Sequence, residues 1–195
     1  MKKNNWKLYG IFSALLIIVV VAGFYLTSGG KQQTLDNNQT QLLEASAVAA
    51  DMDMDFMRDA NNDGLFEVKI GKYAQEHASS EDVKTLAQHM VTEHTRINNS
   101  LKELAQKKKI TLTEQINDKV QKDYDKVAEK TGNDFDKEYV DMMVSKHKDG
   151  IDLFEKEWNK GKDEEIKSWA NKNLPALKEH LKMAEDTRDK LTAQK

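Results

Sequence analysis

The sequence predicts an all-α protein, and three observations support that prediction. After Asp51, apolar residues recur at helical spacing along nearly the whole chain. No run of alternating β-branched residues bounded by turn signals interrupts them. The chain of 195 residues contains a single proline, Pro175. Four long amphipathic helices, with one long connection between the second and the third, predict a four-helix bundle in which those two helices can run parallel.

Ahead of the bundle, residues 1–30 predict a membrane-spanning helix. Between Lys7 and Lys31 lie 23 uncharged residues, which include the run IFSALLIIVVVAGFYL. An apolar run of this length can cross a bilayer as a helix. Lys2, Lys3 and Lys7 precede it, so the N-terminus is expected in the cytoplasm and the body of the protein outside. A retained anchor is favoured over a cleaved signal peptide, because the apolar run is long and TSGGKQQ offers no A-x-A cleavage pattern.

Residues 31–50 predict a polar tether that changes to helix-forming composition near Leu42, and residues 51–195 predict the bundle domain. The first bundle helix is expected over about 53–78. The stretch NNDG from Asn61 to Gly64 is poor helix interior and favours a kink or an interruption. The inward face is mostly small and reads Phe56, Ala60, Gly64, Glu67, Gly71, Ala74 and Ala78.

The second helix is expected to begin at the cap SSED, where the hydroxyl of Ser79 or Ser80 can accept from a free backbone N–H, and to end near Lys109. A connection of residues 110–133 follows, in which a short helix is expected to end at Gly132. The inward face of the second helix reads Val83, Leu86, Met90, His94, Ile97, Leu101 and Leu104.

The third helix is expected over about 134–160, with Gly161 as its stop, and the fourth over about 163–193. Pro175 is expected to bend or break the fourth helix. The inward face of the third helix reads Phe135, Tyr139, Met143, His147, Ile151, Phe154 and Trp158. That of the fourth reads Leu174, Leu177, His180, Ala184 and Leu191.

Four polar residues lie near the middle of their helices and on the inward faces: Glu67, His94, His147 and His180. Helices of similar length that pack side by side bring their midpoints to one level, and two residues of error shift a side chain by only about 3 Å. The four residues are therefore expected to share one layer of the core. One carboxylate and three imidazoles are ligands that suit Zn, Fe or Cu.

Met90 and Met143 extend this hypothesis, because each lies one helical turn before a histidine in the repeated pattern Met-Val-x-x-His. Thioether sulfur is a soft ligand that favours Cu(I). The simpler interpretations stay open: histidines hydrogen-bonded in the core, methionines as packing residues, and a metal-free cluster in which Glu67 pairs with a protonated histidine. His77 and His89 fall off the inward faces and are interpreted as surface residues.

Several other classes of site are excluded or disfavoured. A ferritin-type di-iron centre needs Glu-x-x-His, and Val91, Val144 and Leu177 occupy the positions where that Glu would stand. Residues 59–70 imitate a calcium loop, but Ile70 stands where the bidentate Glu belongs. The chain has no cysteine, which excludes disulfides. A net charge of -3 and the absence of a basic stripe in the sequence exclude nucleic acid as an expected partner.

Three stretches have a recognisable order and spacing: GLFEVKIGKYAQEHASSEDVKTLAQHMVTEHTRINNSL, GNDFDKEYVDMMVSKHKDGIDLF and LPALKEHL. Over about residues 54–191 the chain resembles the bacterial family called domain of unknown function 4142. The resemblance implies an exported, ferritin-like four-helix protein and no particular activity; the anchor-like N-terminus is the main departure. The family pattern corresponds here to Glu67, His94, His147 and His180, together with Phe135, Asp136 and Tyr139.

The sequence thus predicts a membrane-anchored, ferritin-like four-helix bundle outside the cytoplasm, in the periplasm or at the cell surface. The favoured function is transition-metal binding in the Glu/His layer, for metal buffering or a stress response in the envelope. The alternative is a metal-free structural or protein-interaction bundle whose polar layer fixes helix register. An enzyme would need an open coordination position, which a sequence cannot show, so that class stays open while a non-enzymatic role is favoured.

Overall fold

The computed structural model describes residues 24–26, 32–34 and 37–193. The chain divides into two compact units, Met1–Val48 and Ala49–Lys195. The domain boundaries expected at residues 30 and 50 stay a prediction.

In the first unit, strand β1 (Phe24–Leu26) pairs antiparallel with strand β2 (Gln32–Thr34), and Tyr25 lies opposite Gln33. The sequence did not predict this ribbon. Nearly all of the expected membrane-spanning segment, residues 1–30, lies outside the described residues, and the described part of it contains β1. Among the helices that the structure describes, none is both long and apolar enough to span a bilayer. Membrane anchoring therefore stays a prediction.

Helix α2 (Asn37–His77) begins well before the expected residue 53, so the second half of the expected tether is helical. The predicted interruption at Asn61 to Gly64 is wrong, because α2 is continuous there. Asn61 Nδ2 donates to the Thr113 carbonyl at 2.9 Å, and Asn62 Oδ1 accepts from the Asn117 backbone N–H at 2.9 Å. These bonds to the connection between the second and third bundle helices offset the low helix propensity of the stretch. Residues 59–70 therefore form helix rather than a calcium loop.

Helix α3 (Glu81–Lys108) begins after Ser80, as expected, but the cap differs from the prediction. Within the described chain the Ser80 hydroxyl makes no capping hydrogen bond. The Asp136 carboxylate instead accepts from the backbone N–H of Ser79 at 2.9 Å and of Ser80 at 2.8 Å. A residue of the third bundle helix thus fixes the turn between the first two.

The long connection contains helix α4 (Asp118–Ala128), as expected. Gly132 does not end α4; it is the first residue of helix α5 (Gly132–Lys160), with a φ of 58° that suits glycine. Helix α6 (Glu164–Ala193) contains Pro175, so the predicted break is wrong. Pro175 is exposed on α6, and the nearby residues Leu174 and Leu177 are buried and hold the helix against the bundle.

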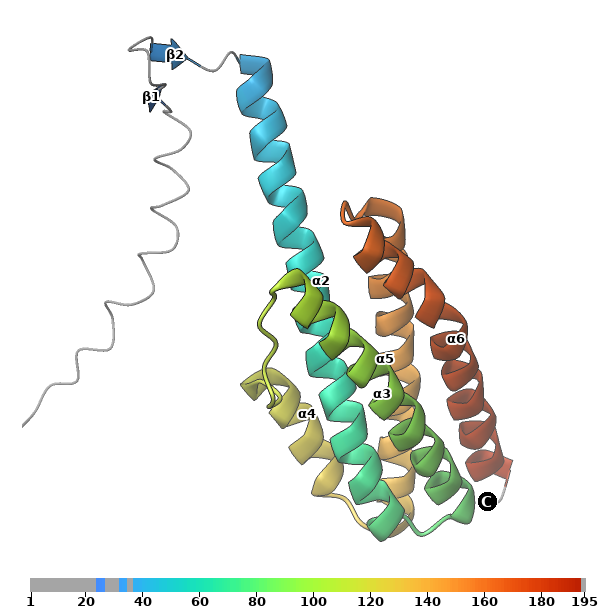
Figure 1. Cartoon of the computed structure of the whole chain (residues 1–195). Helices are drawn as coiled ribbons and strands as arrows, with labels where there is room; N and C mark the ends of the chain where they lie inside the picture. Colours follow the sequence, from blue (N-terminus) through green and yellow to red (C-terminus); the bar gives the residue numbers. More distant parts are fainter. Residues whose placement is uncertain (1–23, 27–31, 35–36, 194–195) are drawn as a thin grey trace, which may run out of the picture. The chain divides into compact units, whose positions relative to one another are not determined.

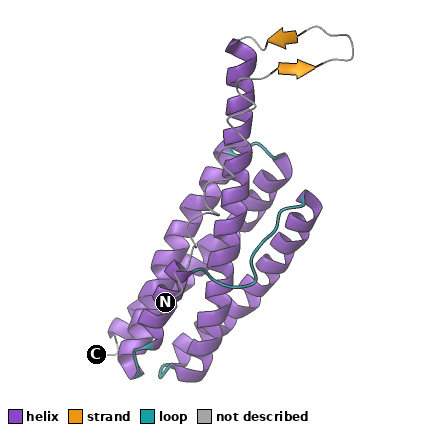
Figure 2. Cartoon of the chain, turned by 90° about the vertical axis from the view of Figure 1, so that its left-hand side faces the viewer, coloured by secondary structure: helices purple, strands orange, loops and turns teal. Residues whose placement is uncertain are grey.

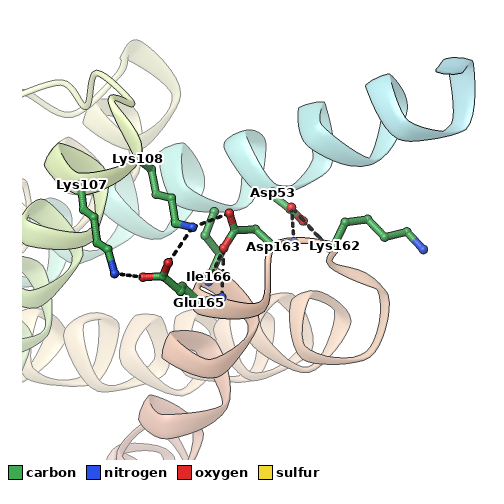
Figure 3. A network of polar contacts seen from close by, with 7 residues as sticks. All are labelled: Asp53, Lys107, Lys108, Lys162, Asp163, Glu165 and Ile166. Carbon is green, nitrogen blue, oxygen red and sulfur yellow. Dashed lines mark hydrogen bonds and ion pairs between the residues drawn. The ribbon is translucent and has the colours of Figure 1, made fainter.

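Trp158 was predicted to face inward, but its side chain is 41% exposed, and Glu157 is buried in its place. The reason lies at the corner between α5 and α6 (Figure 3). Asp53 on α2 accepts there from the backbone N–H groups of Lys162 at 3.0 Å and Asp163 at 2.8 Å. The last turn of α5 is covered on the side of Glu157, while Lys167 lies over the Trp158 ring. Beside Asp53, Lys108 forms ion pairs with Asp163 and Glu165 (Figure 3).

In the second unit, α3 and α5 run in one direction, while α2 and α6 run in the other (Figures 1 and 2). The connection through α4 returns the chain along the bundle, so the predicted parallel arrangement is confirmed. The buried apolar residues form two clusters. On α3 the last residue of one cluster is Met90 and the first residue of the other is Ile97. On α5 the corresponding residues are Val144 and Phe154. A polar layer separates the two clusters.

Candidate metal centre

One polar side chain from each of the four long helices forms this layer. Glu67 comes from α2, His94 from α3, His147 from α5 and His180 from α6. Their exposed fractions are 4%, 6%, 1% and 1%, in that order. The expectation from the helix midpoints, that these residues share one level of the core, therefore agrees with the structure. Their role as metal ligands stays a prediction.

The nitrogen and oxygen atoms of the layer converge. His94 Nε2 and His147 Nε2 are 3.3 Å apart, and one ring nitrogen from each of the three histidines lies within 4.8 Å of the others. Glu67 Oε2 contacts His94 Nε2 and is 3.7 Å from His147 Nε2. Two ligands of a tetrahedral ion with bonds near 2.0–2.1 Å are about 3.3 Å apart. The separation of His94 from His147 is thus the one that a shared ion requires.

A hydrogen bond determines which ring nitrogen of His147 carries the proton. Its Nδ1 lies 2.8 Å from the Met143 carbonyl, which can only accept, so Nδ1 carries the proton and donates. Nε2 then presents its lone pair toward His94 and Glu67. Metal-binding histidines are commonly oriented by such a bond from the second nitrogen. The spacing of Met143 and His147 in the sequence supplies it, because the carbonyl lies one helical turn before the ring.

The layer places one buried carboxylate among three imidazoles, and the groups shift one another's pKa values. Burial by itself would raise the pKa of Glu67, but the neighbouring His147 and His94 lower it to about 2, so the carboxylate is ionised. Burial lowers the pKa of His147, and burial together with the nearby imidazoles lowers that of His180 to about 3. Burial disfavours a net charge in the layer, and a metal ion is one group that could balance the carboxylate of Glu67.

Buried polar atoms without a hydrogen-bond partner gather around the layer. Among the described residues they include Glu67 Oε2, His180 Nδ1, Tyr139 Oη and Asn98 Oδ1. The contact of Glu67 Oε2 with His94 Nε2 is close but lacks hydrogen-bond geometry. Such atoms are rare in folded proteins. Within the described ranges they do not form a closed hydrogen-bonded network, and a polar site of this kind can accommodate an ion or water.

A cavity of about 30 Å³ adjoins Glu67, His94 and His147, and Asn98 lines it as well. The sequence reasoning missed Asn98, although it lies one turn after His94 on the same side of α3. Gly64 provides the space for it, because a Cβ at position 64 would lie 2.0 Å from Asn98 Oδ1. A cavity of this size with several polar atoms around it can hold a water molecule.

The two methionines are fully buried in the apolar cluster beside the layer, together with Phe66 and Ile70. This environment fits a packing role for Met90 and Met143, and their role as soft ligands stays a prediction.

His77 is exposed and stacks on Tyr73, as predicted for a surface residue. His89 is partly exposed, which agrees with a position at the surface, but its ring also meets the buried His180 ring edge-on at 5.3 Å, a contact that the sequence did not predict.

The sequence profile of the family described as "Domain of unknown function (DUF4142)" matches residues 38–187 of the chain. The chain is also similar in structure to a DUF305 protein from Streptomyces coelicolor that is described as secreted. The TM-score is 0.61 at 12% sequence identity, and the similarity covers 72% of this chain and 94% of that one. At this identity the likeness shows the helical fold alone. No curated protein matches the sequence.

Proposed function

The chain belongs to the family of domain of unknown function DUF4142, and we propose that it is a transition-metal-binding protein. In this proposal a ferritin-like four-helix bundle, anchored through residues 1–30, holds one metal ion outside the cytoplasm. The ligands are the carboxylate and the three imidazoles of the layer: Glu67, His94, His147 and His180. The protein would buffer such a metal in the cell envelope or respond to its excess.

One observation carries this proposal: three buried imidazoles present ring nitrogens within 4.8 Å of one another, beside a buried carboxylate oxygen. Burying these groups together is unfavourable unless something compensates them. A single cation would accept the lone pair of His147 Nε2 and balance the charge of Glu67 at the same time.

The ligand atoms limit which metals can bind. Imidazole nitrogen and carboxylate oxygen suit Zn, Cu and Fe, and they suit soft ions that prefer sulfur ligands less well. With the three histidines and Glu67 all bound, a tetrahedral ion has no free position, as in structural zinc sites. Four protein ligands therefore favour retention of the ion over catalysis.

Two observations support a location outside the cytoplasm. The apolar run in residues 1–30 follows Lys2, Lys3 and Lys7, which is the pattern that leaves the following domain outside. The DUF305 protein with the similar fold is described as secreted.

The test is metal content. The full chain, purified in mild detergent without a His tag, is loaded separately with Zn²⁺, Cu²⁺ or Fe²⁺, dialysed, and analysed for metal per chain. We expect one ion per wild-type chain and its loss in His94→Ala and His147→Ala. His77→Ala is the matched control, because its ring lies on the exposed surface against Tyr73. A wild-type protein that unfolds cooperatively but retains none of these metals would contradict the proposal.

The competing function is a metal-free interaction or structural protein, and the contact between Glu67 and His94 favours it. A protonated His94 would make that contact an internal ion pair, which can fix the register of neighbouring helices. In that case Glu67→Gln would lower the stability of the metal-free protein strongly, while metals would leave the wild-type melting temperature unchanged. A rise in melting temperature on adding metal, absent from His147→Ala, would exclude this alternative.

A further inference from the structure

The histidine rings form a continuous series that extends beyond the layer. Within the layer, the His180 ring lies 5.0 Å from that of His94 and 5.3 Å from that of His147, measured between centroids. The His180 ring also lies 5.3 Å from that of His89, at an interplanar angle of 86°. His89 is partly exposed, whereas the other three are buried. The series therefore leads from the surface of α3 to the centre of the bundle.

An ion that reaches the layer must lose its water between apolar helices. Removing the hydration of a bare cation in such a medium is very unfavourable. A nitrogen ligand at the surface would replace water before the ion moves inward, so that the ion stays coordinated at each step. His89 occupies the required position, because its ring contacts a layer histidine and still reaches solvent.

His180 differs from His147 in a way that suits transfer. The Met143 carbonyl holds His147 Nδ1, whereas His180 Nδ1 has no hydrogen-bond partner among the described residues. The His180 ring is thus not fixed by a hydrogen bond at that nitrogen.

The opposite side of the layer is less suitable for a cation. There the small cavity is lined by Lys146, whose Nζ is 2.8 Å from an Asp123 carboxylate oxygen and 3.7 Å from one of Asp63. The lysine side chain is 15% exposed, and these two contacts hold it beside a cavity of only about 30 Å³. An ion with its shell of several water molecules is larger than that cavity.

We propose that His89 is a transient metal ligand that takes the ion from solvent and passes it to His180, which delivers it to the layer. This inference rests on the metal binding proposed above. Because His89 acts during passage and not in the final complex, its removal must change the rates of loading and release by the same factor. The equilibrium affinity must stay unchanged.

The test compares rates with equilibrium for the full chain in mild detergent. Zn²⁺ is mixed rapidly with the metal-free protein, and uptake is followed with a chromophoric chelator; release is followed into excess EDTA. We expect His89→Ala to slow both processes about tenfold or more, which corresponds to about 1.4 kcal/mol in each barrier. Stoichiometry and dissociation constant should equal those of the wild type. His77→Ala should match the wild type in every measurement.

The outcomes separate the two proposals. A wild-type chain that binds no Zn²⁺, Cu²⁺ or Fe²⁺ overturns both the metal function and the role of His89. A wild-type chain that binds metal, with His89→Ala loading at the wild-type rate, overturns only the role of His89. Loss of bound metal at equilibrium in His89→Ala also overturns it, because His89 would then be a permanent ligand. Far-ultraviolet circular dichroism and thermal unfolding of the metal-free variant establish that it folds.

Discussion

Replacing Glu157 by glutamine should stabilise the protein above about pH 7 and leave its stability at low pH nearly unchanged. The Glu157 side chain is buried, and its Oε1 has no hydrogen-bond partner in the described part of the chain. It faces Asp53, which is held at the α5–α6 corner by the backbone N–H groups of Lys162 and Asp163 (Figure 3). Burial, and then the neighbouring charge of Asp53, raise the pKa of Glu157 to about 7.

Proton binding determines whether the free energy of unfolding rises or falls with pH. Between pH 4.5, the ordinary pKa of the group, and about 7, folded Glu157 holds a proton that the unfolded chain has released. The free energy of unfolding therefore decreases as the pH rises through that window. At about 1.4 kcal/mol per pH unit, the difference corresponds to about 3 kcal/mol. The corner lies at the end of the bundle near solvent, where screening reduces the effect to about 1–2 kcal/mol.

Urea unfolding of the metal-free protein measures this difference, at pH values from about 4.5 to about 8.5. The stabilities of Glu157→Gln and wild type should coincide at the acidic end and diverge as the pH rises, with the variant more stable. Histidines titrate in both proteins and cancel in the comparison. Glu103→Gln, at an exposed position on α3, is the control. A constant gap between Glu157→Gln and wild type over the whole range would refute the reasoning.

Three further substitutions test other contacts. Gly64→Ala should lower the stability measured by thermal unfolding by about 1–2 kcal/mol, because its Cβ would displace the buried Asn98 amide and this outweighs the better helix propensity of alanine; adding Asn98→Ala should recover most of the loss, and a double variant as unstable as the single one would argue against this contact. Asp136→Ala should lower the free energy of unfolding in urea by about 1–3 kcal/mol, because two backbone N–H groups at the α2–α3 turn lose the carboxylate to which they donate; unchanged stability would mean that water replaces the carboxylate without cost. Pro175→Ala should raise the thermal midpoint by the equivalent of about 1–2 kcal/mol, because the restored helical N–H stabilises the folded chain more than the added freedom of the unfolded chain destabilises it; a lower midpoint would contradict that account.

The helical period of the sequence predicted the core because one face of each long helix is buried against the others. On α3 the expected residues Val83, Leu86, Met90 and His94 are all buried. The level of the polar layer was predictable for the same reason, since a rise of about 1.5 Å per residue converts position in the sequence into height in the bundle. The pattern does not determine whether the layer holds an ion, because protonation and ligand geometry depend on distances between helices.

The errors and omissions arose where a distant part of the chain supplies the decisive contact. Asn61 and Asn62 are poor helix formers, yet their amides are bonded to the connection between α3 and α4. His89 precedes His94 by five residues, which turns it about 140° away from the inward face of α3 at about 100° per residue. That flank nevertheless lies against α6, where the ring meets His180. Sequence periodicity describes one helix at a time and cannot show such contacts.

The contact of Asp53 with the α5–α6 corner also has a kinetic consequence. It joins residues 109 and 110 positions apart, whereas α5 and α6 are joined directly by the short turn at Gly161 to Asp163. Local helical hairpins form readily, and contacts between distant segments close later because loop closure costs entropy. Interactions that form after the transition state slow unfolding and leave the folding rate nearly unchanged. The carboxylate of Asp53 is therefore expected to determine how long the folded chain survives rather than how quickly it forms.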